Sequence, residues 1–131
     1  MIALDTNVLA RYLLDDEPVQ ARAARRLLGD AGMQYWVPVT VVLELSWVLR
    51  RSEAPRAVIL ARLHDLLSLR NVRAQNAELV FQALRWSAEG MELADALHLS
   101  LSGKAERFAT FDEALVRQAR KLGVHPPVAA P

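Results

Sequence analysis

Apolar residues follow two patterns that alternate along this chain. Short apolar runs are typical of buried strands, and longer segments with helical spacing are typical of amphipathic helices. The runs predict strands at residues 2–4, 35–37 and 108–110 and a brief strand around Val72. The longer segments predict helices at about residues 5–14, 18–29, 40–51, 55–67, 77–88, 93–102 and 112–122.

Short strands separated by helices predict βαβ units. The expected fold class is therefore α/β, with a short, mainly parallel sheet flanked by helices on both faces. In such sheets, ligands bind at the carboxyl ends of the strands. Acidic residues that directly follow a strand are thus the first candidates for a functional site.

The length of 131 residues suits a single domain, expected at residues 1–124. The segment 125–131, HPPVAAP, is expected to be a tail in which two adjacent prolines stop regular structure. The chain has no cysteine, which excludes disulfides and thiolate metal ligands. It shows neither a secretory signal nor an apolar run of the about 20 residues that cross a bilayer. We therefore expect a cytoplasmic protein with no membrane segment.

Arginine supplies 14 of the 16 basic residues. Its planar guanidinium binds phosphate with two parallel hydrogen bonds and stacks on bases, which suits a nucleic-acid partner. A coding bias toward GC-rich codons would enrich arginine in the same way.

Two aspartates directly follow predicted strands and so belong at the carboxyl edge of the sheet. Asp5 follows the first strand, and Asp112 follows the strand at residues 108–110. Capping of the next helix is the alternative role for each of them, because aspartate is a preferred N-cap residue.

Glu44 shares one face of its predicted helix with Val41, Trp47 and Val48. This apolar face is expected to point toward the core. A carboxylate there must be paired, neutralised or bound to a metal ion. Pairing with a buried arginine is the structural alternative.

Asp95 lies near the start of the predicted helix LADALHLSLS, between the small residues Ala94 and Ala96. The start of a helix favours an anion or a well-ordered carboxylate. Glu92 lies one turn earlier and His98 one turn later. His98 is expected to be a hydrogen-bonded packing residue.

Clustered carboxylates repel one another unless some are protonated or a divalent cation neutralises them. Oxygen ligands without a histidine or cysteine set favour Mg²⁺ or Mn²⁺ over zinc. Such an ion activates water and neutralises a phosphodiester, which is the chemistry of a nuclease. Spacing alone, however, does not select four acids from the 15 present.

Four segments, MIALDTNVLARYLL, VLELSWVLR, LADALHLSLS and ATFDEAL, together resemble PIN-domain ribonucleases, specifically the VapC-type toxins of toxin–antitoxin pairs. The resemblance implies a PIN-like three-layer fold and a metal-binding quartet of Asp5, Glu44, Asp95 and Asp112. It also implies that Thr6, Asn7 and Thr110 orient this quartet. The implied reaction is Mg²⁺- or Mn²⁺-dependent hydrolysis of structured RNA, such as tRNA or rRNA, by metal-activated water. Glu92 stands where some relatives carry aspartate.

The same resemblance implies a homodimer and a cognate VapB-like antitoxin as partner. Helical surfaces near Tyr12, Leu13, Leu27 and Ile59 could supply an apolar groove for that partner, although most of these side chains suit the core. Four arginines are expected near the mouth of the site, where they could contact RNA or end helices in solvent: Arg11, Arg50, Arg51 and Arg56. Trp36, Trp47 and Trp86 are expected to pack rather than stack on bases.

Two other readings remain open. A catalytically inactive PIN-like interaction module should have lost one or more of the four acids, but all four are present. A phosphorelay receiver domain should carry paired acids after its first strand and a lysine after a late one. Here Asp5 stands alone, and Lys104 precedes its strand.

Overall fold

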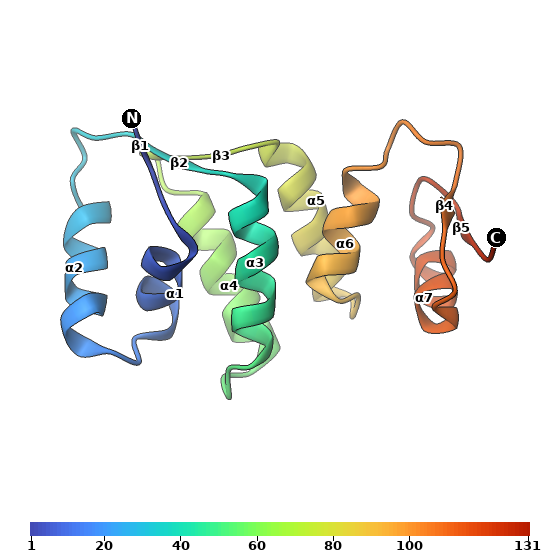
Figure 1. Ribbon diagram of the computed structural model, residues 1–131, viewed down its shortest axis with the longest axis horizontal. Helices are drawn as coiled ribbons and strands as arrows, with labels where there is room; N and C mark the ends of the chain where they lie inside the picture. The colour runs from blue at the N-terminus through green and yellow to red at the C-terminus, as the bar shows by residue number, and fades with distance from the viewer. The chain divides into compact units, whose positions relative to one another are not determined.

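The computed structural model describes residues 1–131 as a mixed α/β protein with seven helices and short parallel strands (Figure 1). It divides into two compact units, Met1–Ala77 (the first unit) and Glu78–Pro131 (the second unit). The first unit holds β1 (Ile2–Ala3), α1 (Thr6–Leu14), α2 (Pro18–Leu28), β2 (Tyr35–Val37), α3 (Val39–Arg50), α4 (Arg56–Leu67) and β3 (Val72–Ala74). The second unit holds α5 (Ala77–Ala88, whose first residue ends the first unit), α6 (Leu93–Ser100), β4 (Phe108–Ala109), α7 (Glu113–Leu122) and β5 (Val128–Ala129). None of these helices has the length and apolar composition that crossing a membrane requires.

The first unit is built on a parallel sheet in the order β1-β2-β3. Parallel neighbours need a crossover connection, which α1 and α2 supply between β1 and β2, and α3 and α4 between β2 and β3. Pairing extends past the strands, because Leu4 N–H donates to Trp36 O and Gln75 N–H to Val37 O, both at 2.9 Å. The carboxyl ends of the strands thus meet at one edge, where α1 and α3 begin.

The core of the first unit consists of aliphatic side chains from its helices together with β2. Leu9, Val37, Leu45 and Leu63 are fully buried. Helices α1 and α2 lie side by side, and α1 also contacts α3 and α4 (Figure 1). Packing of α1 against three helices fixes the start of this helix, where the candidate residues lie.

Tyr35, at the start of β2, is the largest fully buried side chain. Its hydroxyl donates a hydrogen bond to the Leu27 carbonyl near the end of α2, so the buried polar atom is satisfied. Burial raises the pKa of Tyr35 above its ordinary value of 10.0, and the negative charge of Asp30 raises it further. The neutral phenol therefore links α2 to the sheet.

The second unit pairs β4 with β5 in parallel. Phe108 N–H donates to Pro127 O at 2.9 Å, and Thr110 N–H donates to Ala129 O at 3.0 Å. The prediction that regular structure stops at the two prolines is therefore wrong for residues 128–129. Proline lacks an N–H, but its carbonyl still accepts a hydrogen bond, as Pro127 does from Phe108. Burial of the Val128 side chain further stabilises β5.

The predicted α/β class, helices and parallel strands are otherwise confirmed, with small shifts at the ends. Helix α3 begins at Val39, immediately after Pro38, and α6 ends at Ser100 rather than residue 102. Prolines and glycines mark several boundaries correctly: Pro18 begins α2, and Gly123 ends α7 in a left-handed conformation with φ 63°.

Candidate active site

Asp5 lies just after β1 and is the N-cap of α1. Its backbone carbonyl accepts hydrogen bonds from the N–H groups of Val8 (3.2 Å) and Leu9 (3.5 Å), but its side chain makes no capping hydrogen bond. The residue is exposed. The Asp5 side chain thus does not cap the helix, and its carboxylate makes no hydrogen bond to the first turn of α1.

Thr6 connects this junction to α3. Its side chain is buried, with 3% of the residue exposed, and its hydroxyl donates a hydrogen bond to Oε1 of Glu44. Since Thr6 directly follows Asp5, this contact brings the Glu44 carboxylate to the first turn of α1. The partner of Glu44 is a hydroxyl group and not a buried arginine.

The expected burial of Glu44 is wrong. The core-facing side of α3 carries Val42, Leu45, Ser46 and Leu49, whereas Glu44 is exposed. Apolar residues occupy nearly every side of this helix, so their periodicity does not identify the buried face. The hydrogen bond with Thr6, rather than an apolar environment, sets Glu44 apart.

Gln75 is a residue at this edge that the sequence pattern does not reveal. Its side-chain Oε1 accepts a hydrogen bond from Val39 N–H at 2.9 Å, at the start of α3. The N-cap residue Pro38 has no side-chain acceptor, so Gln75 supplies it from just beyond β3. Gln75 therefore fixes the helix that carries Glu44.

Asp112 follows β4 in the second unit and caps α7. Its Oδ1 accepts a hydrogen bond from Leu115 N–H at 3.1 Å, so the capping role is real at this position. Its own N–H donates to Thr110 Oγ1 at 3.1 Å. These two hydrogen bonds fix the turn from Thr110 to Asp112, and capping uses only one carboxylate oxygen.

Asp95 lies in the first turn of α6, which follows the N-cap Glu92. It is partly exposed, beside the fully buried Ala96. His98 is exposed, so the expectation that it packs is wrong. The small neighbour Ala96 does face the core, which leaves Asp95 at the border between core and solvent.

The four predicted acids are divided equally between the units, with Asp5 and Glu44 in the first and Asp95 and Asp112 in the second. Neither unit by itself groups three or more acidic, histidine or cysteine side chains that could hold a metal ion. The local contacts join Thr6 to Glu44 and Thr110 to Asp112. The carboxylate and hydroxyl oxygens at the β1–α1 junction have the hard-donor chemistry that Mg²⁺ and Mn²⁺ prefer.

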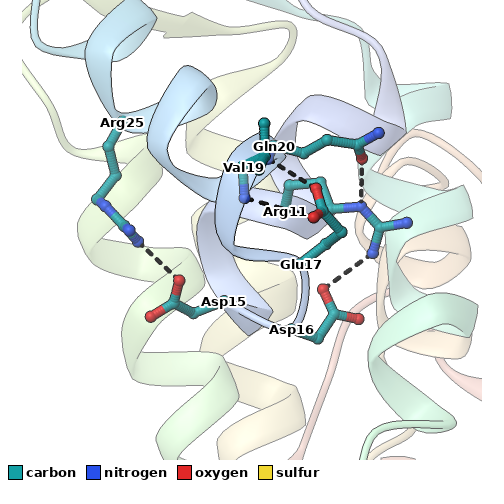
Figure 2. Close-up of polar contacts among 7 residues, drawn as sticks. All are labelled: Arg11, Asp15, Asp16, Glu17, Val19, Gln20 and Arg25. Carbon is teal, nitrogen blue, oxygen red and sulfur yellow. Dashed lines mark hydrogen bonds and ion pairs between the residues drawn. The ribbon is translucent and has the colours of Figure 1, made fainter.

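Arg11 is held by neighbouring side chains, as Figure 2 shows. Its Nε donates to Gln20 Oε1 at 2.8 Å, and its Nη1 donates to Asp16 Oδ1 at 2.9 Å. Together with Asn7 and Leu27, it lines a groove between α1 and α2 with a volume of about 500 Å³. The Arg11 guanidinium is thus oriented, and Asp16 offsets part of its charge.

The other three arginines predicted to contact RNA lie at helix ends. Arg50 ends α3, Arg51 follows it, and Arg56 begins α4, all three exposed. Leu13 and Ile59 belong to the core, as predicted for most of the four groove candidates, whereas Tyr12 and Leu27 are partly exposed. The expectation that all tryptophans pack is wrong for Trp47, which is 49% exposed, while Trp36 and Trp86 are partly buried.

Comparison with curated proteins and with solved structures gives no match. The PIN domain family matches residues 2–121, which includes both acid-bearing strand–helix junctions. PIN domains are generally nucleases and typically use divalent metal ions. Because the match spans nearly the whole chain and agrees with its mixed α/β fold, this chain belongs to the PIN domain family.

Proposed function

We propose that this chain is a metal-dependent endoribonuclease in which Asp5, Glu44, Asp95 and Asp112 bind Mg²⁺ or Mn²⁺. One observation carries the proposal: Thr6, which directly follows the exposed Asp5, hydrogen-bonds the exposed carboxylate of Glu44. Asp5 does not use its side chain to cap α1. Negative charges held together repel, and a divalent cation relieves that repulsion.

The residues around the acids have distinct proposed roles. A divalent ion would lower the pKa of a water molecule and neutralise charge on the scissile phosphate. Thr6 would orient Glu44 through its hydroxyl, and Thr110 would shape the turn that presents Asp112. Asn7, exposed beside Thr6, would orient the same junction.

We further propose that residues 1–124 act as one PIN-like domain and that the protein is a VapC-type toxin. The support is the set of four motifs in register within the family match. The proposed substrate is structured RNA, either tRNA or rRNA. The proposed partners are a cognate VapB-like antitoxin and a second copy of the chain, in the cytoplasm.

Four arginines are proposed to bind RNA phosphates: Arg11, Arg50, Arg51 and Arg56. Asp16 offsets part of the Arg11 charge, so Arg11 should bind a phosphate less strongly than it would without this ion pair.

Cleavage of total RNA with and without divalent ions tests the catalytic proposal. The purified chain should cut RNA with Mg²⁺ or Mn²⁺ and stop in EDTA. Asp5→Asn and Asp95→Asn should abolish cleavage, whereas Asp65→Asn, on the exposed side of α4, should not. Intact RNA with every metal tested would favour the inactive interaction module, and full activity in both active-site variants would reject the quartet.

A further inference from the structure

Phe111 has the most exposed large hydrophobic side chain of the protein, at 88%. It lies between Thr110 and the proposed metal ligand Asp112. Burying a phenylalanine side chain is worth about 1.5–3 kcal/mol, and the fold gains almost none of this at position 111. A single exposed apolar residue is common in proteins and does not by itself indicate a binding site. The residues around Phe111 must therefore supply the evidence.

A hydrophobic staple is the structural role open to Phe111. In this motif the residue before the N-cap packs on the fourth residue of the helix, and Phe111 and Val116 occupy these positions around Asp112. A ring that is 88% exposed buries little area against Val116. A staple therefore accounts for only a small part of the apolar surface of Phe111.

The surroundings of Phe111 are basic. The ring borders a hollow of about 320 Å³ whose other lining residues include Thr110, Glu113, Arg117 and Arg120. Arg117 and Arg120 are three residues apart on α7 and so lie on the same face. Two guanidinium groups outweigh the single carboxylate, which leaves the hollow net positive beside an open aromatic face.

This combination matches the two parts of a nucleotide. An aromatic ring stacks on a base, and a guanidinium donates paired hydrogen bonds to a phosphate. The volume is at the lower end of the range for small-ligand sites. Since duplex bases are already stacked on their neighbours, a ring of this kind selects an unpaired base.

The turn that carries Phe111 is fixed before any ligand binds. Asp112 N–H is bonded to Thr110 Oγ1 and Leu115 N–H to Asp112 Oδ1, each at 3.1 Å. A fixed backbone lowers the entropy lost on binding. Because Phe111 directly precedes Asp112, a base stacked on the ring would be bound within one residue of a proposed metal ligand.

We propose that Phe111, Arg117 and Arg120 bind an unpaired nucleotide of the RNA substrate, with its base on the ring and a phosphate on the arginines. This inference rests on the proposed ribonuclease function. It deepens that function by assigning three residues outside the acidic quartet that would hold one nucleotide of the substrate.

Binding without cleavage tests this subsite separately from catalysis. The probe is a short fluorescein-labelled single-stranded RNA of mixed sequence, followed by anisotropy in EDTA with the full chain. Phe111→Ala should weaken binding about 5- to 150-fold, the usual effect of losing one stacked base. Phe111→Trp should keep the affinity within about 3-fold, because it preserves a stacking face. Leu101→Ala, which removes an exposed apolar side chain just after α6, is the control and should bind as the wild type does.

Two further variants separate stacking from packing and charge. Phe111→Leu keeps an apolar side chain for the staple but has no ring, so it should bind as weakly as Phe111→Ala. Arg117→Gln and Arg120→Gln should each lower the slope of log affinity against log salt by about 0.7. Phe111→Ala should weaken the binding of a hairpin, in which every base outside the loop is paired, less than it weakens the binding of the single strand.

Each outcome has a defined meaning. If Phe111→Ala and Phe111→Leu bind like the wild type, and the wild type still cuts RNA with Mn²⁺, the subsite is wrong and the ribonuclease proposal stands. If the wild type neither binds nor cuts RNA, both proposals fall. A lower melting temperature in Phe111→Ala, restored with full affinity by Phe111→Leu, would identify a staple. Loss of self-association in sedimentation, with RNA binding unchanged, would identify a protein interface, and either result overturns the subsite.

Discussion

The β1–α1 and β4–α7 junctions have similar residues but different side-chain hydrogen bonds. In each, an aspartate is the N-cap of a helix after a short parallel strand, and a threonine lies beside or near it. Asp112 caps its helix through a hydrogen bond to Leu115 N–H at 3.1 Å, whereas the Asp5 side chain caps nothing. Thr110 bonds within its own turn, while Thr6 reaches Glu44, 38 positions away in the sequence.

This difference separates structural from chemical roles for the same residue type. A capping side chain stabilises a helix by about 0.5–2 kcal/mol, and α1 forgoes this contribution even though Asp5 stands at the right position. Its carboxylate is instead left exposed at the strand edge where ligands bind in parallel sheets. The β1–α1 junction is therefore the more specialised of the two.

Replacing Asp5 should have the largest effect on function. Asp5→Asn should lower the initial rate of RNA cleavage by about 100-fold or more, because it removes a charge that we propose binds the metal ion. This is the scale of losing one transition-state contact. The melting temperature should not fall, since no cap is lost. Rates measured beside the Asp65→Asn control check this, and a stability loss without a rate loss would reverse the comparison.

Metal binding should stabilise the wild type next most strongly. At a Mn²⁺ concentration about 100 times its dissociation constant, the gain in unfolding free energy should be about 2.7 kcal/mol, because the ion binds only the folded chain. Melting curves of a metal-free preparation measure the shift. Asp5→Asn should show a much smaller shift, and an equal shift in both proteins would place the ion elsewhere.

The two threonines should respond differently to removal of their hydroxyl groups. Thr6→Val should weaken Mn²⁺ binding by about 10- to 100-fold, the usual effect of losing an orienting partner, and Thr6→Ser should restore it. Thr110→Val should change Mn²⁺ affinity less, because its hydroxyl is bonded to a backbone N–H. Calorimetric titration compares the three variants, and equal losses at both threonines would contradict the assignment.

The smallest effects concern helix capping. Asp112→Ala should lower the free energy of unfolding by about 1 kcal/mol, while Asp112→Asn should retain it, because asparagine caps as well as aspartate. Asp5→Ala should cost less than Asp112→Ala, since its side chain makes no capping bond. Urea unfolding curves measure these differences, and equal costs at both positions would show that the junctions are not distinct.

Local features could be predicted from the sequence, and contacts between distant segments could not. Pro18 and Gly123 mark helix ends by their own backbone preferences, and Tyr35–Val37 is an apolar run stopped by Pro38. The positions of Asp5 and Asp112 at strand ends follow from the same reasoning. The metal role of the quartet remains a prediction that comes from the family resemblance.

The rest depends on tertiary structure. Glu44 was expected on a core-facing side, but α3 is apolar nearly all round, so only its packing selects the buried face. The Thr6–Glu44 and Gln75–Val39 hydrogen bonds join residues 38 and 36 positions apart, which no local pattern encodes. Residues 128–129 form a strand only by pairing with β4, about 20 positions earlier, which their own sequence after two prolines does not predict.

The polar contacts of the α1–α2 connection also bear on the order in which the chain folds. Arg11 bonds Asp16 and Gln20, and Arg25 bonds Asp15, over separations of 5, 9 and 10 residues (Figure 2). Short loops close at a lower entropic cost than long ones, so this helical hairpin should form early. The Thr6–Glu44 bond spans 38 residues and should form later, so the hairpin should gain hydrogen-exchange protection before the acidic junction is assembled.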